Sequence, residues 1–158
     1  MTLSYSPPPG FAIQPPHSAP RWRWYERLAG LAVGGILLTL LVTASRLTPS
    51  TRGLGTHQQL GLPPCTVLDW FGFRCPSCGM TTSWVYMVRG RPLAAIQANA
   101  GGALLAVVAA VCGPWLTISA ARGRWLARPP AEWLMVAVGA AIIGITILHW
   151  TVRLSLGW

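Results

Sequence analysis

The sequence predicts an all-α integral membrane protein with about three transmembrane helices and an interfacial or re-entrant amphipathic helix that carries a cysteine motif. Hydrophobic residues make up 53% of the 158 positions and charged residues only 9%, whereas a soluble domain has roughly 25% charged residues. Three long stretches contain no Asp, Glu, Lys or Arg, namely 28–45, 101–121 and 133–151. Each is close to the roughly 20 residues that cross a bilayer core.

The chain divides into a tail, 1–20, and a helical membrane domain, 21–158. The tail is rich in proline and has few large apolar side chains. It cannot bury enough surface to offset the entropy of an ordered chain, so we expect it to be disordered. In the first span, Gly30 and Gly34 form a GxxxG pair that would let another helix approach closely, although glycine is also simply common in membrane helices.

The net charge of +9 comes from arginines that flank the apolar stretches and do not form a block. This distribution favours the lipid bilayer as partner and argues against nucleic acid. Arginines are packed closely before the first span and between the second and third, which favours a cytoplasmic amino terminus. We therefore expect a multi-pass protein of the cell membrane, with the long loop at 46–100 outside. A membrane protein partner or a homo-oligomer is also compatible with the sequence.

The most chemically informative segment is Cys75-Pro76-Ser77-Cys78-Gly79, within the long loop. Apolar side chains with helical spacing follow it and predict an amphipathic helix over 80–88. A start near Pro76 is the alternative, since proline is favoured as a first helical residue and Cys78 would then begin a polar stripe. Gly79 and Thr81 are expected to shape and cap the start of this helix. A short helix over 92–98 then leads through Asn99 into the second span.

This segment resembles DUF2752, a family of small bacterial membrane proteins of unknown function. The resemblance covers roughly 61–121 and rests on a CPxCGxT motif, a glycine near the end of the next helix, and an asparagine before a span. These residues are Cys75, Pro76, Cys78, Gly79, Thr81, Gly90 and Asn99. The chain departs from the family in having Thr82 where members often carry arginine, and Ala100 where many carry proline. The resemblance implies the architecture and the importance of the motif, and it implies no reaction.

Three roles for the cysteines are compatible with the sequence. As a redox centre, Cys75 and Cys78 would exchange thiols and disulfides, because a helix start and the neighbouring Arg74 favour a thiolate. As a zinc site, Cys75 and Cys78 would form a knuckle, with Cys65 and His57 as the third and fourth ligands. As a structural staple, Cys75 would form a disulfide with Cys65 or Cys78.

The sequence favours the structural role, or the binding of a membrane partner, over catalysis. No paired carboxylates and no glycine-rich phosphate loop are present, so hydrolytic and phosphate chemistry have no support. The βαβ pattern that accompanies a thioredoxin-type CxxC is also missing. Cys112 lies inside the second span and is expected to be a small buried apolar residue. No residue is therefore assigned a catalytic role, although Cys75 and Cys78 remain redox candidates.

Overall fold

The computed structural model describes residues 21–50, 52–127 and 129–156, so the tail predicted at 1–20 lies outside the described residues. Helices account for the regular structure of these ranges. In chain order they are α1 (Trp24–Arg46), the 3-10 helix η1 (Thr56–Leu60), α2 (Thr66–Phe71), α3 (Met80–Val88), α4 (Pro92–Ala98), α5 (Ala100–Arg122) and α6 (Glu132–Ser155). The predicted all-α class is confirmed.

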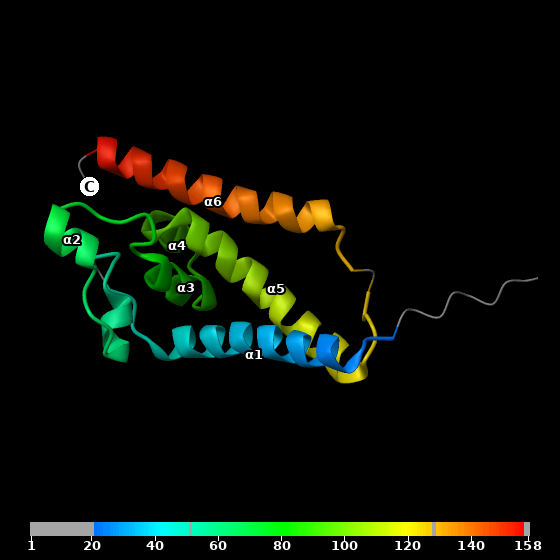
Figure 1. Ribbon diagram of the computed structural model, residues 1–158. Helices are drawn as coiled ribbons and strands as arrows, with labels where there is room; N and C mark the ends of the chain where they lie inside the picture. Colours follow the sequence, from blue (N-terminus) through cyan, green and yellow to red (C-terminus); the bar gives the residue numbers. More distant parts are fainter. Residues whose placement is uncertain (1–20, 51, 128, 157–158) are drawn as a thin grey trace, which may run out of the picture.

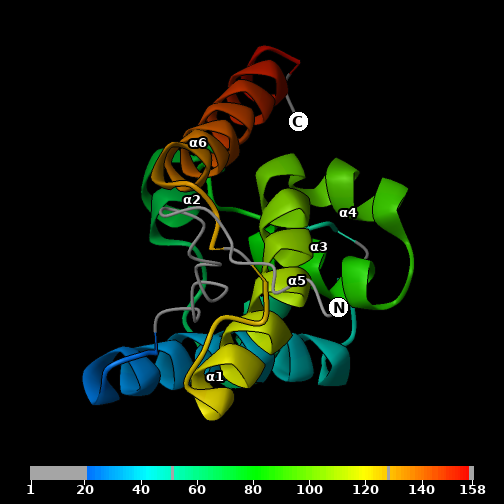
Figure 2. The same cartoon turned by 90° about the vertical axis from the view of Figure 1, so that its right-hand side faces the viewer.

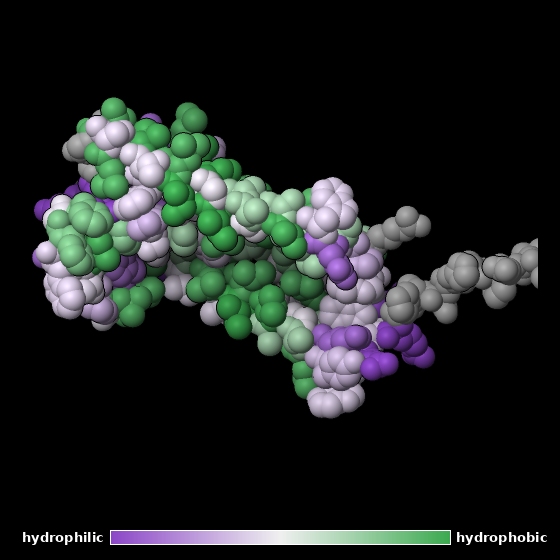
Figure 3. Space-filling model, turned by 45° about the horizontal axis from the view of Figure 1, so that its top comes forward, coloured by the Kyte–Doolittle hydropathy of each residue, from purple (hydrophilic) through white to green (hydrophobic). Residues whose placement is uncertain are grey.

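Helices α1, α5 and α6 are long and apolar enough to cross a membrane. Each contains one of the predicted spans and extends it at both ends. Figure 3 shows apolar side chains over the middle of the molecule, with hydrophilic ones gathered towards its two ends. No residue of α6 is buried within the protein, which suits a helix whose apolar surface is covered by lipid chains.

Helix α5 lies between α1 and α6 (Figure 2) and packs most extensively against α1. The two glycines of the GxxxG pair lie at this contact. A Cβ on Gly30 would come within 3.0 Å of the Ala120 Cβ, and one on Gly34 within 2.9 Å of the Thr117 backbone nitrogen. The pair therefore allows the close helix approach that its spacing suggested.

Helices α3 and α4 lie at one end of the molecule, between the long helices (Figure 1). Helix α3 packs against α4, α5 and α1. Its Val85 is fully buried, and Trp84 is 8% exposed. Both side chains belong to one apolar cluster. Its other members include Ala44 of α1, Leu47 at the C-cap of α1, and Ala106 of α5. The predicted amphipathic helix thus lies inside the helix packing.

The alternative helix start near Pro76 is wrong. Helix α3 begins at Met80, and Gly79 precedes it with a φ of 86°. That left-handed backbone cannot continue a right-handed helix, so the cysteine motif forms a separate turn. The expected polar stripe from Cys78 does not exist either, because Cys78 lies outside α3 and Thr82 is buried.

Candidate functional site

Three thiols meet at the end of the molecule that holds α2. The Sγ atoms of Cys75 and Cys78 are 3.2 Å apart, and those of Cys78 and Cys65 are 3.4 Å apart. All three lie within 4.8 Å of one another, and no other group of metal-ligating side chains this close exists in the described part of the chain. We call Cys65, Cys75 and Cys78 the three-cysteine cluster.

Two separate segments supply the cluster. Cys65 is the N-cap residue of α2, whereas Cys75 and Cys78 belong to the turn before α3. In that turn the Cys78 amide donates to the Cys75 carbonyl oxygen at 3.0 Å, which brings the first and last side chains of the CPSC sequence to the same side. The Ser77 hydroxyl lies 3.2 Å from the Cys75 sulfur.

Gly79 lets this turn approach other parts of the backbone. A Cβ at this position would come within 2.5 Å of the Ala98 carbonyl oxygen and 2.7 Å of the Gly53 carbonyl oxygen. Its positive φ adds a second reason for glycine. No side chain caps α3, so the expected capping role of Thr81 is wrong. Thr81 instead lines the cavity beside the cysteines.

Asn99 connects the turn to the second span. Its amide Nδ2 donates to the carbonyl oxygens of Pro76 and Cys78, at 3.0 and 3.3 Å. Its Oδ1 accepts from the Gly102 amide at 2.8 Å and so caps α5. The residue is 2% exposed, and its own carbonyl oxygen accepts from the Ser83 hydroxyl at 2.9 Å. One buried side chain thus positions the cysteine turn relative to a membrane helix.

The last turns of α6 hold the same region from the other side. The Trp150 indole nitrogen donates to the Arg74 carbonyl oxygen at 2.6 Å, and the Arg153 guanidinium donates to the Ala98 carbonyl oxygen at 2.8 Å. Neither residue was predicted at the site from the sequence. Only the packing of α6 brings Trp150 and Arg153 to the site, because both residues are far along the chain from the cysteine motif and form no sequence motif with it.

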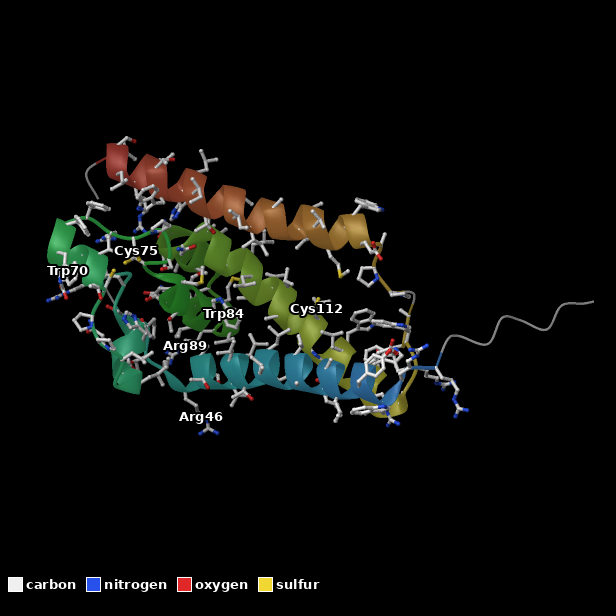
Figure 4. All side chains as sticks on the ribbon, viewed as in Figure 1. Arg46, Trp70, Cys75, Trp84, Arg89 and Cys112 are labelled. Carbon is white, nitrogen blue, oxygen red and sulfur yellow. The ribbon has the colours of Figure 1, made fainter. Side chains whose placement is uncertain are left out.

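A cavity of about 330 Å³ lies beside the cluster, with all three cysteines in its wall. His57 also lines it, but its Nε2 lies 3.1 Å from the Pro63 carbonyl oxygen. The imidazole is not part of the group of converging ligand atoms. The structure therefore brings together three of the four predicted metal ligands and leaves His57 outside. Cys112 lies midway along α5, far from Cys75 (Figure 4).

The thiols of Cys65 and Cys78 differ in acidity. Burial raises the pKa of Cys65, but hydrogen bonds from the Leu68 amide and from the Cys78 and Cys75 groups outweigh it and lower the pKa to about 7. Burial raises the pKa of Cys78 to about 12, with further contributions from its Cys75 and Cys65 neighbours. Of these two thiols, Cys65 therefore loses its proton first, and Cys78 stays protonated beside it.

The spacing of the sulfurs can be compared with two kinds of bond. A disulfide needs its sulfurs at about 2.05 Å, so either close pair would have to approach by more than 1 Å. Tetrahedral zinc with bonds of about 2.3 Å places its thiolates about 3.8 Å apart. The close pairs, at 3.2 and 3.4 Å, are a few tenths of an ångström shorter than that value, and all three sulfurs lie within 4.8 Å of one another. The thiol geometry thus fits a metal ion with small adjustments.

Part of the chain is similar to a known protein family. Residues 65–113 match the family model described as "Protein of unknown function (DUF2752)". No curated protein and no solved structure is significantly similar to the chain. The matched range starts at Cys65 and includes the whole cluster and Asn99. The segment that builds the three-cysteine site is therefore similar to DUF2752, as the resemblance of its motif implied.

Proposed function

We propose that this protein is a membrane component that binds a thiophilic metal ion, zinc foremost, through Cys65, Cys75 and Cys78. The observation that supports this is the convergence of three sulfurs from two segments. A disulfide uses two sulfurs and leaves the third without a role, whereas a metal ion uses all three. Cysteine thiolates are the preferred ligands of zinc and other soft metal ions.

The surroundings of the cluster suit the charge of such a site. Three thiolates around a divalent ion carry one net negative charge. Arg74 and Arg153 line a small pocket together with Cys75 and Cys78. These guanidinium groups would offset the negative charge and stabilise the deprotonated ligands.

The fourth coordination position would face the cavity beside the cluster. Zinc sites with three protein ligands leave one position for water or another molecule. The cavity wall offers the polar side chains of Gln58, Ser77 and Thr81, which could hydrogen-bond to such a ligand. The metal would then both hold α2 against the start of α3 and keep one exchangeable position. A residue from a membrane partner or a second copy could also complete the site.

Metal analysis of the full chain, purified in mild detergent under reducing conditions, tests the proposal. We expect about one metal ion per chain, and its loss in Cys65→Ser, Cys75→Ser and Cys78→Ser. Cys112→Ser is the matched control and should keep the metal, since this residue lies in α5 away from the cluster. The proposal fails if protein from zinc-supplemented cells holds no stoichiometric metal, or if the cluster variants retain it.

Thiol-disulfide exchange is the second candidate, supported by the 3.2 Å separation of the Cys75 and Cys78 sulfurs. In this reaction the two thiols would form a disulfide and pass two electrons and two protons to a partner disulfide, which is reduced to two thiols. Alkylation with and without reductant, followed by mass spectrometry, distinguishes the candidates. A Cys75–Cys78 disulfide in freshly isolated protein supports exchange, and three free thiols together with bound metal exclude it.

The orientation in the cell membrane is part of the same proposal. The amino terminus would be cytoplasmic and the cysteine cluster would face the outside, because arginines concentrate before α1 and after α5. Labelling of whole cells with a membrane-impermeant maleimide tests this, using single cysteines placed at the exposed positions Trp70 and Leu126. Labelling of position 126 and not of position 70 in intact cells would show that the orientation is opposite to the one proposed.

A further inference from the structure

The start of α1 meets the end of α5 at the end of the molecule opposite α2 (Figure 1). A second cavity lies at this junction. Its volume is about 660 Å³. Its aliphatic lining, which we call the floor, is formed by Ala29 and Val33 of α1 and Leu116 of α5, and its aromatic lining, which we call the wall, by Trp22 and Trp125. Arg21 and Arg23 also line the cavity and are exposed, and we call this side the mouth. We call this site the arginine groove.

The aromatic wall of the groove is held in place by several contacts. The Trp22 amide donates to the Gly123 carbonyl oxygen at 3.0 Å. The Trp22 and Trp125 rings pack edge to face, with their centroids 4.4 Å apart. Trp125 also stacks on Trp115 at 5.1 Å. A Cβ on Gly30 would lie 2.5 Å from the Trp22 ring. The wall is therefore built into the junction of the two helices and does not depend on a ligand for its shape.

The polar contacts that the described residues make do not neutralise the charges of Arg21 and Arg23, since the Arg23 guanidinium donates to the uncharged Tyr25 hydroxyl at 3.0 Å. The Glu26 carboxylate, the acidic group in the described wall of the groove, accepts from the Arg23 backbone amide at 2.7 Å. Arg27 is committed to the end of α5, where it donates to the Ala120 and Ala121 carbonyl oxygens. Arg21 and Arg23 are exposed. The Trp22 indole nitrogen is buried and has no acceptor among the described residues.

The apolar floor and the two arginines together indicate which class of ligand fits the arginine groove. A small soluble anion would use the arginines but not the apolar floor, which follows the membrane-spanning part of α1. A zwitterionic lipid would use the floor but gain little from the two guanidinium groups. A phospholipid with a net negative headgroup matches both, with its acyl chain along Val33 and Leu116 and its phosphate near the arginines.

We propose that the arginine groove is a binding site for one anionic phospholipid, of the phosphatidylglycerol type. The phosphate is held by Arg21 and Arg23, and the glycerol backbone and upper acyl chain lie against the tryptophan wall. The arginine groove shares no residue with the three-cysteine cluster, so its test does not depend on the outcome of the metal test.

Native mass spectrometry of the full chain in detergent tests the site by titration with phosphatidylglycerol and with phosphatidylcholine of the same acyl chains. We expect one phosphatidylglycerol to be retained and phosphatidylcholine to be retained at least tenfold more weakly. Arg21→Gln with Arg23→Gln should weaken phosphatidylglycerol retention about thirtyfold, the contribution of two arginines at an anionic membrane surface. Arg46→Gln with Arg52→Gln removes the same charge elsewhere and should change retention less than twofold.

Two further measurements distinguish the lipid site from general charge attraction and from a site for a soluble anion. Val33→Trp fills the floor without changing any charge and should also abolish retention, while thermal unfolding in detergent checks that the variant is folded. Free glycerol phosphate should not compete with the lipid. Equal retention of the two lipids, equal loss in both arginine pairs, unchanged retention in a folded Val33→Trp protein, or displacement by free glycerol phosphate would each overturn the proposal.

Discussion

The Asn99 side chain donates a hydrogen bond to the carbonyl oxygen of Pro76, 3.0 Å away, at the point where the second membrane span begins. The same side chain bonds the Cys78 carbonyl oxygen and caps α5. The position of the cysteine turn and the start of the span are thereby coupled through a single buried amide.

Replacing Asn99 separates these two functions. Asn99→Asp keeps the Oδ1 acceptor that caps α5 but removes the amide donor to the turn, whereas Asn99→Ala removes both. Each carbonyl left unpaired in a buried site costs about 1–3 kcal/mol. We expect both variants to lose metal affinity and stability, since Asn99→Ala loses the cap, worth about 1 kcal/mol, and Asn99→Asp places a buried carboxylate against two carbonyl oxygens. Denaturant unfolding in detergent and metal titration check this, with exposed Gln97→Ala as control. Equal metal affinity in wild type and Asn99→Asp would contradict it.

Gly79 is predicted to be intolerant of any side chain. Gly79→Ala must place a Cβ 2.5 Å from the Ala98 carbonyl oxygen while keeping a φ of 86°. The left-handed backbone alone costs roughly 1–2 kcal/mol, and the clash adds to it. Gly72 is the matched control, since it has a φ of 74° but open space where a Cβ would lie. Gly72→Ala should lose only the backbone contribution, so the difference between the two variants in unfolding free energy measures the clash. Equal losses would show that Gly79 is not needed for close approach.

The reactivity of the thiols should follow their order of acidity. With its pKa lowered to about 7, Cys65 of metal-free protein should be alkylated by iodoacetamide with a rate that rises through pH 7. Cys78, with a pKa of about 12, should stay largely unmodified at pH 8. Peptide mass spectrometry after short exposures gives both rates. Faster modification of Cys78 than of Cys65 would contradict the assignment.

The same pKa values set the sign of the pH dependence of stability. Because the folded state lowers the pKa of Cys65 from 9.0 to about 7, its contribution to stability is complete above about pH 9 and is lost as the pH falls through 7. Cys78 acts in the opposite sense, since its pKa is raised from 9.0 to about 12. Its contribution is complete below about pH 9 and is lost as the pH rises towards 12. Unfolding of metal-free Cys65→Ser and Cys78→Ser across pH 6–10 should show these opposite trends.

Trp150 should anchor the end of α6 to the cysteine turn. Trp150→Phe keeps an aromatic ring but removes the donor to the Arg74 carbonyl oxygen, which costs about 1 kcal/mol. Trp133→Phe is the control at the other end of α6, where the indole is 71% exposed. We expect faster proteolysis of the 46–100 loop and weaker metal binding only in Trp150→Phe. Equal proteolysis rates and equal metal binding in the two variants would show that Trp150 does not anchor α6 at the cysteine turn.

Local sequence patterns predicted α1, α3, α5 and α6 because the causes of these helices are local, whereas the short helices η1 and α2 were not predicted. Apolar stretches of membrane-spanning length must form helices to satisfy their backbone groups, and Pro92 together with Asn99 marks the limits of α4. The start of α3 was less certain from sequence. Pro76 favours a first helical turn, but the crowding of Gly79 against Ala98 and Gly53 selects the turn. No pattern within the motif could reveal that contact.

The sequence by itself determined that this chain is a helical membrane protein with cysteines at one loop, since hydropathy and charge act on each segment separately. Only the tertiary structure decided which side chains share a site. The meeting of Cys65 with Cys75 and Cys78, the exclusion of His57, and the bonds from Trp150 and Arg153 depend on how α2, α3 and α6 pack. Such contacts join residues distant in the chain, and their energies come from packing and buried hydrogen bonds that no local periodicity records.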